Sequence, residues 1–395
     1  MNVKFSTKFV AASAAAVMAL SLAGCSGGSM DDSSSSGAKA SGDSITIGTV
    51  TTNSGTAAAY GEAEVKGFEL AVSEINAKGG INGKKVKLES MDDKGDATEA
   101  SNAYNKLAGD NNVLAVAGPT ISATTAAVAP LADQSKLVTI APAATSDSIE
   151  TGNYLFRTCF KDSYQGEVAA RFAAENLKVK KVAVLYGTGD PYSSGVGEAF
   201  AKAAEKLGLE VVDKESSSSA DDTEYSAQLQ KIQASGAELL YAPYYYSVAG
   251  PYIIPQARSV GFEGYVMGPD GYDGLKLTGD KSQYNKTYYT THYSADDNTN
   301  TKVQDFIKSY KSKNNAEPNT FAALGYDTIY MIKQAIEKAG KNATREDVCN
   351  AVASMTFDGV TGMFTMDKSG SPTKSVIVLE MKDGKPVYNT TVQPK

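Results

Sequence analysis

The feature that most constrains the fold is a regular alternation of short β-rich runs with longer helical patterns. Alternation of this kind is typical of parallel βαβ units, in which helices cover both faces of a sheet. The first series comprises strand 45–50, helix 62–76, strand 86–91, helix 97–108, strand 113–117, helix 122–135 and strand 137–140. The pattern predicts an α/β fold built from doubly wound, Rossmann-like sheets.

A second series starts afresh at Lys181, so two similar lobes are expected. It comprises strands 181–186, 209–213, 238–241 and 264–267 with helices 193–207, 223–235 and 248–260 between them. The remaining elements are helices near 302–312, 319–339 and 345–354 and strands 375–381 and 386–392. Because these later elements must return to the lobes, the chain is expected to cross between them more than once. Multiple crossings make a hinge, and a hinge implies a cleft.

The lobes are predicted to be discontinuous in sequence. We expect residues 44–161 plus 294–362 to form lobe 1, and residues 162–293 plus 363–395 to form lobe 2. After the first 42 residues the chain is 353 residues long, which is more than one core usually organises.

The first 24 residues have the pattern of a secretory signal peptide. A short basic start with Lys4 and Lys8 precedes an apolar run from Phe9 to Leu22, which is too short to span a bilayer. The segment ends on Leu-Ala-Gly-Cys, which resembles the bacterial lipobox and implies cleavage before Cys25 and lipidation of that cysteine. Residues 25–43, rich in Ser, Gly, Ala and Asp, are then expected to be a flexible tether.

Charge and composition exclude several classes of function. Removal of Lys4 and Lys8 with the signal takes the net charge from −7 to about −9, which disfavours nucleic-acid partners. Beyond Cys25 the chain has only Cys159 and Cys349, interpreted as buried small side chains, although the sequence leaves a disulfide between them open. With a single histidine, His292, and no Cys-x-x-Cys motif, neither a metal site nor a cofactor is expected.

Two strand-to-helix junctions of the first series suit an anion. Ligands of open α/β sheets bind at the carboxyl ends of strands, where helices begin. Residues 118–125 place four hydroxyl side chains at a helix start, so the free helix amides and Ser122 could hold a carboxylate. The next junction, residues 141–146, brings Thr145 on a backbone of small residues. Ser122 and Thr145 could instead only cap or turn the chain, but the two junctions together favour a site.

The junctions of the second series have a different character. Residues 186–192 and 242–246 carry tyrosines, and residues 268–271 place Asp270 after the next strand. Asp270 could be a turn residue between Pro and Gly, and tyrosines often pack structurally. Together the two lobes nevertheless present an anion-binding part, a carboxylate and an apolar wall. This combination is complementary to an amino-acid zwitterion with an apolar side chain.

Nucleotide binding and catalysis are not favoured. The pair Gly187 and Gly189 follows a strand, but Tyr192 stands where the third glycine of a dinucleotide-binding motif is needed. A serine or cysteine hydrolase needs a histidine beside its nucleophile, and His292 lies in an alternating, strand-like run. A secreted hydrolase is therefore kept only as the alternative to a binding protein.

Several stretches resemble the branched-chain amino acid binding proteins of ABC transporters, which have the type I periplasmic binding fold. The stretches are Tyr60-Gly61, residues 69–71, INAKGGING at 75–83, APAAT at 141–145, QARSVG at 256–261 and MGPDG at 267–271. The similarity covers nearly everything after residue 43.

The resemblance implies a role for individual residues. Ser122 and Thr145 would hold the ligand carboxylate, and Ala143 would offer its carbonyl to the ammonium group. Asp270 would pair with that ammonium group, although well-known members of the family have Glu there. The side-chain pocket would be lined by Tyr60, Tyr192, Tyr246 and Phe321, with Tyr245 as a second choice. The first-lobe disulfide of those members has no counterpart here, because the region around Lys94 and Ile121 has no cysteine.

These observations predict an extracytoplasmic, lipid-anchored protein that works as a monomer. It would capture an apolar amino acid between its lobes and deliver it to an ABC permease with its ATPase. A sensor of the same architecture, which reports ligand binding to a membrane receptor, is the leading alternative.

Overall fold

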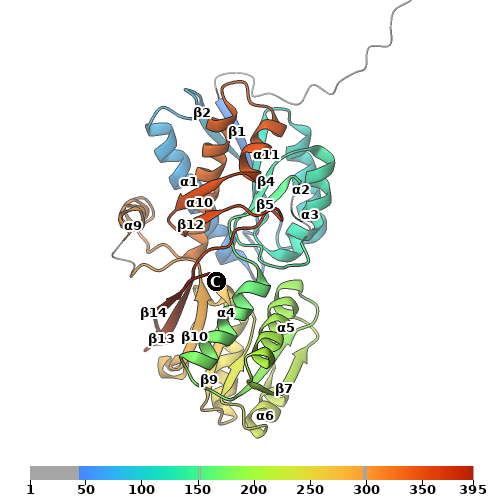
Figure 1. Cartoon of the computed structure of the whole chain (residues 1–395), viewed down its shortest axis with the longest axis vertical. Helices are drawn as coiled ribbons and strands as arrows, with labels where there is room; N and C mark the ends of the chain where they lie inside the picture. Colours follow the sequence, from blue (N-terminus) through green and yellow to red (C-terminus); the bar gives the residue numbers. More distant parts are fainter. Residues whose placement is uncertain (1–43, 150, 152, 297–299, 395) are drawn as a thin grey trace, which may run out of the picture. The chain divides into compact units, whose positions relative to one another are not determined.

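The structure is a computed structural model that describes residues 44–149, 151, 153–296 and 300–394. The predicted signal peptide, Cys25 and the tether lie outside these residues. Two sheets organise the described part of the chain, each with its own set of helices (Figure 1). The predicted α/β class and its two lobes are therefore confirmed.

The first sheet is wholly parallel, with the strand order β2-β1-β3-β4-β5. Its strands are β1 (Ser44–Thr51), β2 (Lys85–Asp92), β3 (Val113–Ala117), β4 (Thr139–Ala141) and β5 (Leu155–Arg157). The helices of this lobe are α1 (Ala58–Ala77), α2 (Ala97–Gly109), α3 (Ser122–Ser135), α10 (Thr320–Ala339) and α11 (Arg345–Ala353). All five residues of β3 are buried, as expected for a central parallel strand covered on both faces.

The second sheet has the order β14-β13-β10-β9-β8-β6-β7. Its strands are β6 (Lys181–Gly187), β7 (Glu210–Ser217), β8 (Leu239–Tyr241), β9 (Tyr265–Gly268), β10 (Thr287–Thr291), β13 (Val376–Lys382) and β14 (Lys385–Val392). The helices along it are α4 (Asp162–Glu175), α5 (Pro191–Lys206), α6 (Ser226–Ala234), α7 (Tyr246–Val248) and α8 (Ile254–Ser259). Strands β6 to β10 pair in parallel, whereas β13 and β14 add an antiparallel edge.

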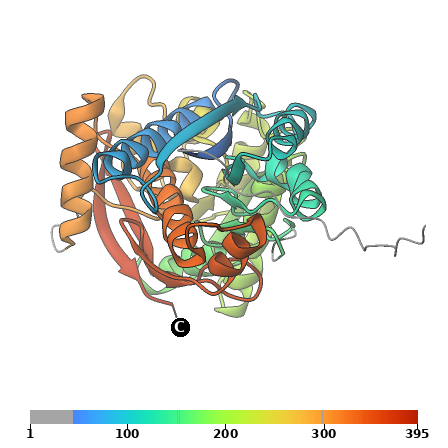
Figure 2. The same cartoon turned by 90° about the horizontal axis from the view of Figure 1, so that it is seen from above.

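Helices α1 and α10 pack side by side although they are far apart in sequence (Figures 1 and 2). Glycines permit this approach: a Cβ atom on Gly67 would lie 2.2 Å from the carbonyl oxygen of Ala322, and one on Gly325 would lie 2.6 Å from that of Glu64. Helix α9 (Thr301–Asn314) also contacts α1, and the Nζ of Lys313 donates a hydrogen bond to the carbonyl of Glu69.

Judged from the elements that the structure describes, the chain changes lobe at three places. The first crossing segment joins β5 to α4, and the second joins β10 to α9. The third joins the short hairpin of β11 (Thr356–Gly359) and β12 (Gly362–Thr365) to β13. The hairpin belongs with the first lobe, because Phe357 and Phe364 pack into the same core as Ile329 of α10.

Three details of the predicted element order are wrong. The second series of elements begins with α4 and not with the strand at Lys181, and β5, which precedes α4, was not predicted; β5 has only three residues, so it leaves almost no periodic signal. The β11–β12 hairpin was also not predicted. The helix expected at 248–260 starts at Tyr246 and contains a π-helical turn (Ala249–Ile253), beside prolines at 251 and 255 that cannot donate helical hydrogen bonds.

Cys159 and Cys349 are both buried and unpaired, so the interpretation as small buried side chains is confirmed. Burial raises the pKa of each thiol to about 12, which keeps both protonated near neutral pH. Among the residues that the structure describes, no helix combines the length and the apolar character that crossing a membrane requires.

Candidate ligand-binding site

The N-terminus of α3 supplies the first part of the site. Ser122 is the first residue of this 14-residue helix and is buried. Its hydroxyl accepts a hydrogen bond from the backbone N–H of Ser146 at 3.2 Å, which leaves its proton free to donate. The amides of the first helical turn have no partner within the helix, so this end carries a partial positive charge. The junction is therefore suited to an anionic group.

The loop after β4 lies against that helix end. The guanidinium of Arg157 holds the loop from behind, because its Nη1 donates to the carbonyls of Ala144 and Ser146 at 3.0 Å each. The hydroxyl of Thr145 is buried and has no hydrogen-bond partner of normal geometry in the described chain. It lies close enough to Asp162 to oppose the rise in the pKa of that carboxyl. Thr145 is thus a buried donor with unused hydrogen-bonding capacity.

Asp270 supplies a buried carboxylate from the second lobe. It begins the 3-10 turn Asp270–Tyr272 directly after β9 and is only 2 % exposed. Its Oδ1 accepts hydrogen bonds from the Tyr192 hydroxyl at 2.8 Å and from Gln165 Nε2 at 3.3 Å. Its Oδ2 lies 3.3 Å from Nε2 of His292. Asp270 is therefore a held carboxylate and not an exposed turn residue.

A second carboxyl group, that of Asp162, lies beside it at the start of α4. Gln165 Nε2 bridges the two groups, since it also donates to Asp162 Oδ1 at 2.8 Å. Burial raises the pKa of Asp162 well above its ordinary value, and the nearby charge of Asp270 adds to this effect. The carboxyl group of Asp162 is consequently harder to ionise than a solvated one.

Aromatic rings from both lobes form one cluster between these polar groups. Tyr60 of α1 stacks on Phe321 of α10 with ring centroids 3.9 Å apart, and Tyr192 stacks on Tyr245 at 5.3 Å. The Tyr60 hydroxyl donates to the carbonyl of Gly271 at 2.5 Å and accepts from the N–H of Tyr246 at 3.0 Å. These hydrogen bonds connect the first lobe directly to the second.

The polar groups and the rings enclose a narrow cavity of about 20 Å³, roughly the room of one water molecule. Its lining consists of Tyr60, Thr120, Ile121, Ser122, Ala143, Tyr192, Tyr245, Asp270, Gly271 and Phe321. Seven of the nine residues predicted from sequence are in this set. Of the other two, Thr145 lies near Asp162, and Tyr246 packs on Tyr60 at 5.0 Å between ring centroids.

Sequence reasoning missed several polar groups around the cavity. Thr120 belongs to the hydroxyl-rich run at the α3 start but received no role; its hydroxyl donates to the buried carboxyl of Glu64 at 2.6 Å. Burial raises the pKa of Glu64 well above its ordinary value. Gln165 and His292 carried no local signal, because their importance comes from contact with Asp270.

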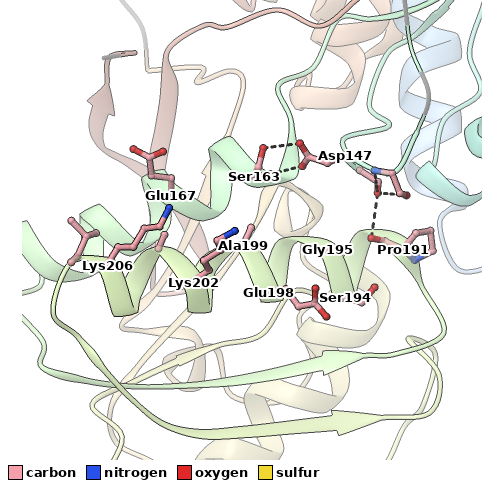
Figure 3. Close-up of a pocket in the computed structure, with 14 residues that line it drawn as sticks. Asp147, Ser163, Glu167, Pro191, Ser194, Gly195, Glu198, Ala199, Lys202 and Lys206 are labelled. Carbon is pink, nitrogen blue, oxygen red and sulfur yellow. Dashed lines mark hydrogen bonds between the residues drawn. The ribbon is translucent and has the colours of Figure 1, made fainter. Parts of the chain in front are cut away.

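Larger hollows are also present, and one of about 430 Å³ has residues of both lobes in its lining, among them Gly55 and Asp190. Another, of about 850 Å³, runs between α4 and α5 and reaches residues 146–148, as Figure 3 shows. Its rim includes Glu167, Glu198, Lys202 and Lys206, which are exposed. At one end, Asp147 accepts hydrogen bonds from the backbone and hydroxyl of Ser163. The charged groups of this groove are solvated and do not converge, unlike the polar groups of a specific small-molecule site.

The burial of Asp273 makes the stability of the protein depend on pH. Burial raises its pKa from 3.8 to about 6, although the Thr320 N–H donates to its carboxylate at 2.9 Å. A raised pKa means that stability from this group is fully present below about pH 4 and is lost as the pH rises through 6. Two pKa units correspond to about 3 kcal/mol.

The free energy of unfolding of the wild-type protein should therefore fall between pH 4 and pH 7 because Asp273 ionises. In the Asp273→Asn protein, which has no such group, we expect this fall to be smaller by up to about 3 kcal/mol. Urea unfolding of both proteins at the two pH values measures this difference. Equal pH dependence in the two proteins would contradict it.

Comparison with known proteins identifies the class that this fold and site define. Residues 44–386 match the family described as periplasmic binding protein, and the chain belongs to this family. It is accordingly a binding protein of the extracytoplasmic space and not an enzyme. The family predicted from the sequence motifs is confirmed.

Particular relatives agree over almost the whole chain. The Leu/Ile/Val-binding protein homolog 3 of Brucella melitensis is 31% identical over 352 residues, which cover 86% of this chain and 92% of the relative. The leucine-, isoleucine-, valine-, threonine- and alanine-binding protein of Pseudomonas aeruginosa is 30% identical over 83% of this chain and 87% of its own. The solved structure of the substrate-binding protein LivJ from Streptococcus pneumoniae, in complex with isoleucine, is 32% identical with a TM-score of 0.82. The match covers 89% of this chain and 100% of LivJ.

Proposed function

We propose that this protein captures an apolar amino acid between its two lobes and delivers it to an ABC permease and its ATPase. The observation that carries the proposal is the convergence of three features around one cavity. They are the N-terminus of α3 with Ser122, the buried carboxylate of Asp270, and the aromatic rings of both lobes. The leucine, isoleucine and valine specificity named for the relatives supports the same ligand class.

The proposed binding mode follows the charges of a zwitterion. The ligand carboxylate would accept hydrogen bonds from Ser122, Thr145 and the first amides of α3. The ammonium group would pair with Asp270 and donate to the carbonyl of Ala143. The apolar side chain would lie among Tyr60, Tyr192, Tyr245 and Phe321, while Tyr246 would support Tyr60 from behind. Each ligand group is thereby matched to a part of the protein with the complementary character.

Binding in this mode requires the lobes to separate and close again. The cavity of about 20 Å³ is smaller than any amino acid. The lobes are joined across it by hydrogen bonds from Tyr60 to Gly271 and from the Ser247 hydroxyl to the Thr56 carbonyl at 2.8 Å. Three crossing segments allow hinge bending, and closure would remove the ligand from water and strengthen its ion pair.

The lobe limits given above, 44–161 plus 294–362 and 162–293 plus 363–395, remain a proposal. The sheet that each strand joins supports them, since β1 to β5 and β6 to β10 fall in different sheets. We further propose that the protein acts as a monomer, because one chain supplies both sides of the site.

An amino-acid screen tests the proposed function. A ligand that binds the folded state at one hundred times its Kd adds about 2.7 kcal/mol of stability. We expect leucine, isoleucine or valine to raise the melting temperature of the protein and lysine or glutamate to leave it unchanged. If none of the twenty amino acids raises it, the proposal fails. A protein that binds but supports no uptake in membranes containing its permease would favour the sensor alternative.

We also propose that the protein is anchored to the membrane by a lipid on Cys25, which the lipobox-like end of the signal supports. Changing Cys25→Ser is expected to release the protein from the membrane fraction or to leave it as an uncut precursor. Cell fractionation with detection of the lipid by metabolic labelling measures this. A Cys25→Ser protein that stays membrane-bound in a mature, lipidated form would contradict the anchor.

A further inference from the structure

The two oxygens of Asp270 are held differently. Oδ1 accepts from Tyr192 and Gln165, whereas the hydrogen-bond partner of Oδ2 among the described residues is His292, whose Nε2 lies 3.3 Å away. Oδ2 and the ring that faces it are both buried. The ring of His292 therefore acts together with Tyr192 and Gln165 to set the orientation of the carboxylate about its final bond, and it is the partner that holds Oδ2.

The ring of His292 is fixed by parts of the chain that belong to the hinge. His292 is the first residue after β10, in the second crossing segment. Its ring stacks on Phe160, in the first crossing segment, with centroids 3.6 Å apart and planes inclined by 24°. Its backbone N–H donates to the hydroxyl of Thr320 at the start of α10 at 3.3 Å. The imidazole thus has little freedom to turn away from Asp270.

The ring acts as a neutral donor. Burial lowers the pKa of His292 to about 4, and the charge of Lys374 in the third crossing segment lowers it further, against the opposing effect of Asp270. Because a carboxylate oxygen only accepts, the neutral ring must carry its proton on Nε2. Its Nδ1 is buried and has no hydrogen-bond partner in the described residues. A neutral donor orients the carboxylate without neutralising its charge, whereas a cation in this place would compete with a ligand ammonium group.

We propose that His292 is a positioning residue for ligand binding: its Nε2–H holds Oδ2 of Asp270 so that the carboxylate presents its charge to the ligand ammonium group. The proposal rests on the proposed function, because it concerns the same site. It adds a residue from the hinge to the ammonium subsite.

Two substitutions of His292 separate the hydrogen bond from the packing. His292→Phe keeps an aromatic ring against Phe160 but removes the donor, whereas His292→Gln keeps a neutral N–H donor of similar reach. We expect His292→Phe to weaken leucine binding by about tenfold, since hydrogen bonds to charged groups are among the stronger ones. His292→Gln should stay within about threefold of the wild-type affinity. Calorimetry measures both, with circular dichroism as the check of folding.

A double-mutant cycle shows whether His292 acts through Asp270. In an Asp270→Asn background, His292→Phe should have little further effect on leucine affinity, because the charge that it positions is gone. An equal loss in both backgrounds would make the effect purely structural and overturn the proposal. So would wild-type affinity in the His292→Phe protein.

A measurement on the unmodified protein covers the case in which His292→Phe does not fold. His292 is the only histidine, so nitrogen-15 labelling of histidine gives the two ring-nitrogen signals of a single imidazole. We expect a protonated Nε2 and an unprotonated Nδ1, with the Nε2 resonance shifting when leucine binds. The opposite tautomer, or no shift on binding, would overturn the proposal.

The outcomes also distinguish this inference from the proposed function. If the wild-type protein binds no amino acid, both are wrong. If the wild-type protein binds tightly and the His292→Phe protein binds equally well, only this inference is wrong.

Discussion

Replacing Asp270 with alanine is expected to weaken amino-acid binding by roughly thirtyfold or more. The carboxylate is buried and held by Tyr192, Gln165 and His292, so the ligand ammonium would be paired with it out of contact with water. Removing one partner of such a pair costs on the order of 2 to 5 kcal/mol, and each 1.4 kcal/mol corresponds to a factor of about ten. Calorimetric titration of the folded variant with leucine measures the loss.

Asp280 offers a matched control for this substitution. It is also an aspartate at the start of a 3-10 turn, but it is exposed and its side chain only caps Ser282 of the same turn. Asp280→Ala should leave leucine affinity unchanged. If Asp270→Ala remains within about threefold of the wild-type affinity, Asp270 is only a turn residue and the zwitterion binding mode is wrong.

The order of the main elements could be predicted because the βα alternation is a local property of the sequence. Strand β3 is a short apolar run, β1 carries β-branched Ile, Thr and Val, and α2 begins after the cap residue Asp96, which accepts from the N–H groups of Thr98 and Glu99. The short strand β5 could not be predicted in this way. Its three residues are fixed by tertiary contacts, including those of the buried Arg157 side chain.

The candidate site likewise combines features that are local in the sequence with contacts between residues that are far apart in it. The hydroxyl groups at the α3 start and the position of Asp270 after a strand are local features, so the sequence indicates them. The partners of Asp270 are not local: Gln165 lies 105 residues away and Tyr192 lies 78 residues away. The choice between Tyr245 and Tyr246 also depended on the fold. Both rings pack on Tyr60, but Tyr245 lines the cavity and Tyr246, the first residue of α7, does not.

The contact between α1 and α10 connects the stability of the first lobe to the site. Tyr60 lies on α1 and Phe321 on α10, so their stacking depends on the separation of these helices. A Cβ atom on Gly67 would lie 2.2 Å from the Ala322 carbonyl oxygen and 2.9 Å from the Tyr326 nitrogen, and both are backbone atoms. Neither helix can relieve such a contact by turning a side chain. The helices would have to move apart.

Gly67→Ala is therefore expected to lower the free energy of unfolding by roughly 2 to 3 kcal/mol, within the usual range for overpacking of a core. Gly109→Ala is the matched control: it also lies in a helix, but its Cβ atom would meet no other atom within 4 Å, so stability should change by less than about 1 kcal/mol. Urea unfolding compares the two variants.

We also expect Gly67→Ala, and not Gly109→Ala, to weaken leucine binding, because separating α1 from α10 draws Tyr60 away from Phe321. A Gly67→Ala protein as stable as the wild type would mean that the two helices can part at no cost, and the stack of Tyr60 on Phe321 would then not depend on their close contact.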